Sequence, residues 1–200
     1  MSQFEFFMAF YSLLLGLAVA ELLLGFGNLV RAARQPRWGV LTPLLGLAIF
    51  VQLIASFADA WMKLKGVSID FAGITAPSMI GVSFFAAAIL VTPRDAAEWP
   101  SLDDYYFARG RWAVAALISV NMLTILFLEI GSGRVARYLP AAQVAYVVIN
   151  TAVVGSLLLA FFSRRPRVIA AGLAVASGIV VLLYATPLDI NGLTARLLQG

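Results

Sequence analysis

The chain has 200 residues, of which 62% are hydrophobic and only 12% are charged, and its net charge is +4. An average soluble domain has about a quarter of its residues charged, so this composition excludes an ordinary water-soluble protein. The absence of Cys and His excludes a disulfide framework, and it excludes zinc or haem bound through the usual side chains. No basic run is long enough for a nucleic-acid-binding surface, and we expect no cofactor and no metal.

Long apolar runs with few charges follow one another along the chain. They predict spans at residues 6–30, 38–61, 71–93, 112–130, 138–163 and 168–188. A helix needs about 20 apolar residues to cross the hydrocarbon core, and backbone polar groups must be satisfied internally there, which favours α-helices. We therefore predict an all-α fold, in which residues 1–200 form one integral membrane bundle of six transmembrane helices.

The basic residues predict an orientation. Nine of the 14 Lys and Arg residues fall in the connectors after the first, third and fifth spans, and five fall elsewhere. Cytoplasmic connectors carry an excess of Lys and Arg. This distribution favours a protein with those three connectors in the cytoplasm and with both termini outside it.

Short matches between the two halves of the chain suggest an internal repeat. Thr92-Pro93-Arg94-Asp95 ends the third span and Thr186-Pro187-Leu188-Asp189 ends the sixth, while Glu5–Ala9 resembles Asp104–Ala108. Because each half holds an odd number of spans, the second copy would be inverted, as in the 3+3 inverted repeats of many secondary transporters. Each match is short, so chance and a true repeat both stay open.

Several polar side chains are predicted near the middle of the membrane. Glu21, Gln52, Asn121 and Asn150 fall close to the centres of their spans, and Tyr146 lies one turn before Asn150. Helical spacing puts each on an inward-facing stripe, and an inverted repeat would gather the first four around its pseudo-two-fold axis. The amides taken singly are also typical of hydrogen bonds that hold helices together, worth about 0.6–2 kcal/mol each.

Among these residues Glu21 carries a carboxyl group. An ionised carboxyl at mid-membrane costs on the order of 2–3 kcal/mol, so it needs a reason to be there. Proton or cation handling is one reason, and a structural hydrogen bond is the other. Asp59 and Glu129 fall nearer the ends of their spans. An i, i+4 pair of Asp59 with Lys63 is expected at the membrane interface, and Glu129, close to Arg134, is expected at the interface too.

Two stretches resemble segments of known proteins. Leu15–Leu23 and Asp104–Trp112 are similar to parts of small, uncharacterised bacterial proteins with six membrane helices. The resemblance implies a bacterial inner-membrane protein and carries no activity with it.

The polar stripes and the resemblance leave two functions open. The first is a small channel or carrier for protons, small cations or a small polar solute, with Glu21, Asn121, Gln52, Asn150 and Tyr146 along its pathway. The second is a non-catalytic subunit or scaffold that packs with other membrane proteins. Without Cys or His, an enzyme is not expected. A small-residue face in the last span also predicts a homo-oligomer in the bilayer, a dimer, or contact with other membrane subunits; it consists of Ala170, Ala171, Ala174, Ser177 and Gly178.

Overall fold

The computed structural model describes residues 3–32, 36–63, 71–131, 133, 135–137 and 140–185, which are almost entirely helical. Six of the helices are long and apolar enough to cross a membrane, which confirms the predicted all-α bundle. The six spans are built on the helices α1 (Gln3–Arg31), α2 (Leu41–Lys63), α3 (Phe71–Val91), α5 (Arg111–Leu123), α6 (Pro140–Phe162) and α7 (Pro166–Ala185). Pro140 and Pro166 open α6 and α7 at the first helical position, where a missing N–H costs no hydrogen bond.

The fourth span begins at Leu102, earlier than the predicted start at residue 112. Four segments continue one another: α4 (Leu102–Tyr105), the π-helix η2 (Tyr106–Gly110), α5, and a second π-helix η3 (Thr124–Ile130). The prediction started later because charged residues such as Asp103 and Arg109 suggested a connector. They lie instead in the first turns of the helix. Short 3₁₀-helices, η1 (Ala96–Glu98) and η4 (Val135–Arg137), occupy the connectors on either side.

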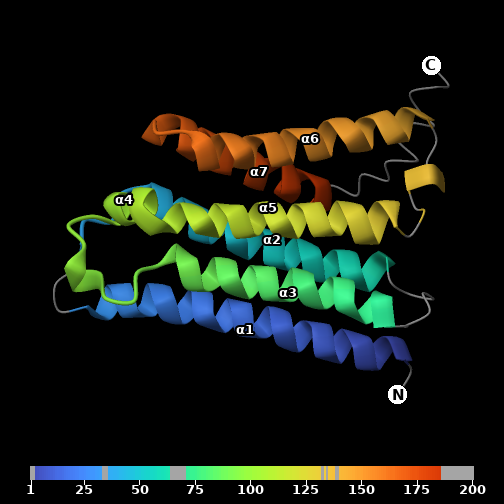
Figure 1. Ribbon diagram of the computed structural model, residues 1–200, viewed down its shortest axis with the longest axis horizontal. Helices are drawn as coiled ribbons and strands as arrows, with labels where there is room; N and C mark the ends of the chain where they lie inside the picture. The colour runs from blue at the N-terminus through green and yellow to red at the C-terminus, as the bar shows by residue number, and fades with distance from the viewer. Residues whose placement is uncertain are drawn as a thin grey trace.

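The helices form two layers. In Figure 1, α1, α3, α5 and α6 lie side by side, and α2 and α7 lie behind them. The closest packing is between α1 and α3, α3 and α5, α6 and α7, and α2 and α7. An inverted repeat would pair α5 with α7 as α1 pairs with α3, yet in the described part of the chain α5 and α7 make no comparable contact. The two halves therefore pack differently.

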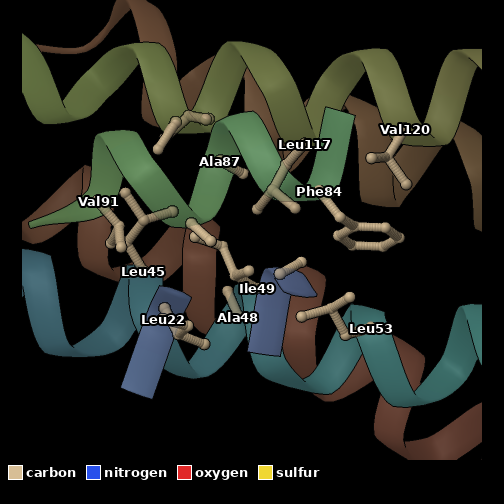
Figure 2. Packing of buried hydrophobic residues seen from close by; sticks show 14 of the residues in the cluster. Leu22, Leu45, Ala48, Ile49, Leu53, Phe84, Ala87, Val91, Leu117 and Val120 are labelled. Atoms are coloured by element: carbon tan, nitrogen blue, oxygen red, sulfur yellow. The ribbon is translucent and has the colours of Figure 1, made fainter. Parts of the chain in front are cut away.

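The bundle has an apolar core and an apolar outer surface. The core is centred on residues from α1, α2, α3 and α5 that are almost fully buried, among them Leu22, Ile49, Phe84 and Leu117 (Figure 2). Large apolar side chains such as Leu23, which is 62% exposed, point outward from the same helices. Apolar residues on both sides of a helix are expected where lipid replaces water.

The bundle has two ends, which we name by the segments that they hold (Figure 1). The connector end holds residues 92–101, between α3 and α4. The terminal end is the end at which α1 begins and α7 ends. At the connector end, Asp103 accepts hydrogen bonds from the backbone N–H groups of Val40 (3.2 Å) and Leu41 (3.0 Å). Gly39 has φ +59°, and a Cβ there would lie against the Asp103 carboxylate. Asp103 thus caps α2 from a distant part of the chain.

Removal of this cap should destabilise the protein. We expect Asp103→Ala to lower the free energy of unfolding by about 1–2 kcal/mol, because two N–H groups at the start of α2 lose their acceptor. Asp103→Asn keeps an oxygen in place and should cost much less. Thermal unfolding in mild detergent measures both, and an equal loss in the two variants would contradict the capping role.

The last two helices pack through small residues. A Cβ at Gly172 would lie 2.6 Å from the carbonyl oxygen of Ser156, so α7 crosses α6 with the backbones close together. The predicted small face is only partly in this interface: Ala171 and Ala174 are exposed, and a Cβ at Gly178 would meet no atom within 4 Å. The exposed part remains free, within this monomer, to face lipid or another protein.

Candidate functional site

A line of polar side chains follows one face of α2 from the terminal end to the middle of the membrane. It consists of Asp59, Ser56 and Gln52, and each contacts a different helix. Spacings of three and four residues put them on one helical face, and seven residues of helix cover about 10 Å along the axis. We call these three residues, with their partners Tyr184, Tyr11 and Asn121 and the buried Glu129 near Tyr184, the polar seam.

The seam begins at two buried carboxyl groups near the terminal end. Asp59 is 9% exposed and accepts a hydrogen bond from the Tyr184 hydroxyl of α7. Glu129 is 2% exposed and lies within electrostatic reach of the same Tyr184. Glu129 belongs to the π-helix η3, whose wider turn changes which side chains face the interior. Such turns are frequent at functional sites.

The middle of the seam links α2 with α1. The hydroxyl groups of Ser56 and Tyr11 are 2.6 Å apart and share a hydrogen bond. Tyr11 is only 1% exposed, and Asp59 lies near enough to interact with it electrostatically. The two hydroxyls therefore continue the line from Asp59 toward Gln52.

The seam ends at a pair of amides. Gln52 lies at the middle of its span, Leu41–Met62, and is 5% exposed. Its Oε1 accepts a hydrogen bond of 2.8 Å from Nδ2 of Asn121, which also donates to the Leu117 carbonyl oxygen. The Nε2 of Gln52 is buried and has no hydrogen-bond partner among the described residues. A buried amide N–H₂ without an acceptor is costly, so a structural role alone does not account for this group.

The seam brings together two of the five predicted site residues. Gln52 and Asn121 meet, but the predicted gathering of four residues is not observed. Because Tyr11 contacts Ser56, the antiparallel helices α1 and α2 place Gln52 beside about residue 15 of α1. Glu21 lies roughly 9 Å farther toward the connector end, half-buried and next to Leu22, which belongs to the same buried cluster as Leu45 and Ala48 (Figure 2).

The other two predicted residues lie on α6. Asn150 donates its Nδ2 to the Tyr146 carbonyl oxygen within the same helix, at 2.8 Å. The Tyr106 hydroxyl of η2 bonds to the Ala160 carbonyl oxygen of α6, which fixes the register of the fourth span against α6. That register places Tyr146, whose hydroxyl oxygen is buried, at about the level of Asn121, and places Asn150 about one turn nearer the connector end.

Apolar side chains fill the bundle beyond the amide pair. Toward the connector end, the same region is occupied by Leu45, Ile49, Leu117 and Leu173, all at 0% exposure. In Figure 2, the side chains of Leu45, Ile49 and Leu117 lie in one cluster with Ala87 and Val91 of α3. The polar seam therefore lies in the half of the bundle near the terminal end, and these four apolar side chains lie beyond it.

Some members of the seam were not predicted as site residues. Asp59 was expected in an interface pair with Lys63, and Glu129 was expected at the interface close to Arg134; the side chains of Lys63 and Arg134 lie outside the described residues. The structure buries both carboxyl groups. The stripe of Gln52, Ser56 and Asp59 on α2 was visible in the sequence and was the available signal. The tyrosines of α1 and α7 gave no such signal, because an aromatic ring in a membrane helix is usually apolar packing.

The chemistry of the seam is that of oxygen and amide groups. Within the described ranges, no three His, Cys, Asp or Glu side chains cluster to hold a metal ion. Carboxylates, hydroxyls and amides in a row can pass a proton or coordinate a small cation. No family model matches the chain, and neither a curated protein nor a solved structure resembles it significantly.

Proposed function

We propose that this membrane protein is a small carrier or channel for protons, small cations or a small polar solute. The observation that carries this proposal is the polar seam, which runs from two buried carboxyl groups at the terminal end to the amide pair at mid-membrane. Ionisable groups inside a membrane are expensive and commonly mark ion or proton pathways. The position of the seam supports entry of an ion or solute from the terminal end. The apolar side chains beyond the amide pair support a conformation that is closed toward the connector end.

Structural hydrogen bonding is the competing explanation for the same residues. Each seam residue of α2 bonds to another helix, as residues that only hold a bundle together would. Two features favour transport. Neutral hydrogen-bonding groups are sufficient to hold helices together, yet the seam contains carboxyl groups. The amide end also retains a buried N–H₂ donor on Gln52 that has no acceptor among the described residues.

Flux through liposomes tests the proposal. Purified full-length protein is reconstituted with a pH-sensitive dye inside, and a proton gradient is imposed; parallel samples carry Na⁺ or K⁺ gradients. We expect the protein to dissipate at least one gradient faster than empty liposomes do. If no gradient decays faster, the transport proposal fails.

A non-catalytic scaffold is the second candidate, favoured by the exposed small residues of α7, Ala171 and Ala174. This face would pack against a second copy or another membrane subunit, and we propose a homodimer there. The scaffold requires no flux, so the liposome experiment separates the two candidates. For neither candidate do we propose catalysis.

We further propose a bacterial inner-membrane location, with the connector end in the cytoplasm and both termini outside. Described arginines at the connector end, such as Arg37, Arg94 and Arg164, support this orientation. Because the chain has no native Cys, single cysteines report accessibility cleanly. Pro100→Cys should react with a membrane-impermeant thiol reagent only from the cytoplasmic side, and Ser68→Cys only from outside. The reverse pattern would invert the orientation.

A further inference from the structure

A groove at the connector end lies outside the polar seam. It has a volume of about 710 Å³ and lies between η2 with the start of α5 on one side and the end of α6 on the other. Its walls include Tyr106, Phe107, Trp112 and Phe161, and its rim holds Arg111 and Arg164. Volumes of this size accommodate small-molecule ligands.

The rim of the groove is basic. Arg111 and Arg164 are both exposed, and neither guanidinium has a carboxylate partner in the described part of the chain. The Arg111 guanidinium lies over the Trp112 ring, 5.9 Å from its centroid, which leaves its N–H groups available to an anion. Guanidinium groups bind phosphate with paired hydrogen bonds. Among the described residues, no acidic side chain lines the groove.

The floor and the adjoining surface are apolar. Trp112 packs edge-on against Phe161, which packs edge-on against Phe162. Phe162 is 74% exposed and Leu159, one turn away toward the membrane centre, is 60% exposed. A ligand with its anionic group between the arginines could therefore lay a hydrocarbon chain along α6.

We propose that this groove binds one anionic phospholipid of the surrounding leaflet, with the phosphate between Arg111 and Arg164 and an acyl chain along Phe162 and Leu159. Basic pockets between membrane helices are known to hold anionic lipid headgroups. A soluble phosphate compound would use the two arginines but not the apolar track, which is why the lipid is favoured.

Titration of the purified full-length protein in a neutral detergent tests the proposal. Short-chain phosphatidylglycerol should raise the midpoint of thermal unfolding by about 3 °C, whereas short-chain phosphatidylcholine and inorganic phosphate should not. Arg111→Gln combined with Arg164→Gln should weaken the response roughly tenfold or more. The matched control, Arg165→Gln with Arg167→Gln, removes two nearby exposed arginines that do not line the groove and should keep it.

A second measurement does not depend on the arginine variants. Brominated phosphatidylglycerol should quench tryptophan fluorescence more than brominated phosphatidylcholine does, and Trp112→Phe should remove that excess while Trp61→Phe keeps it. Three results would overturn the proposal: no preference for phosphatidylglycerol in the wild-type protein, an equal shift with inorganic phosphate, or an equal loss in the control arginine variant.

Discussion

Replacement of Asp59 by Asn is expected to reduce flux through reconstituted protein on the order of a hundredfold or more, the effect typical of losing a positioned proton-transfer group. Asn has nearly the same volume and can still accept the hydrogen bond from Tyr184, so the fold should persist. What disappears is the charge and the titratable proton. Liposome flux and thermal unfolding are measured on the same preparation.

Two controls define what the loss means. Asp59→Glu keeps the charge and should retain part of the flux. Glu21→Gln makes the same carboxyl-to-amide change in another membrane helix, about 9 Å from the level of the amide pair, and should leave flux largely unchanged. Normal flux in Asp59→Asn would reduce the seam to structural hydrogen bonding. If Glu21→Gln lost flux, Glu21 would belong to the transport pathway, as the sequence analysis predicted.

The second large effect concerns the amide pair. Asn121→Leu leaves the buried carboxamide of Gln52 without any partner, and we expect it to cost about 1–3 kcal/mol of unfolding free energy. Replacing both residues by Leu removes the polar groups together and should recover most of that stability. Thermal unfolding of Asn121→Leu, of Gln52→Leu and of the double variant measures this coupling.

Flux separates structure from transport in the same series. The double variant should be stable and yet lose at least about tenfold in flux, because the end of the seam no longer offers amide oxygens to a passing cation or proton. Asn150→Leu is the matched comparison, since its amide bonds only within α6 among the described residues. A stable double variant with wild-type flux would remove the amide pair from any pathway.

The membrane architecture was largely predictable from the sequence. Apolar runs of the right length with few charges located all six spans, because the bilayer imposes the helix length and forbids most charges. The start of the fourth helix was missed for the same reason. Asp103 and Arg109 were assigned to a connector, whereas Asp103 caps α2 from a helix end at the membrane boundary. A long-range cap of this kind leaves no local pattern in the sequence.

The candidate site was only partly predictable. Helical spacing correctly placed Gln52 and Asn121 facing inward, but it gives the face of a helix and not its neighbour. The sequence predicted that Glu21, Gln52, Asn121 and Asn150 would gather around a pseudo-two-fold axis, whereas the structure brings together only Gln52 and Asn121. The burial of Glu129 depends on the π-turn of η3, which an ideal helical wheel does not contain.

The claim at the centre of the proposal is that water and ions reach the seam from the terminal end and stop at the amide pair. Single cysteines along one face of α2 test it, with a small charged thiol reagent applied to each side of the membrane. Ser56→Cys should react from the terminal end, whereas Ala48→Cys, two turns farther in and fully buried, should react from neither side. The lipid-facing control Ile54→Cys should also stay unmodified. An unreactive Ser56→Cys in a folded protein would contradict a water-filled seam, and a reactive Ala48→Cys would contradict the closed apolar half.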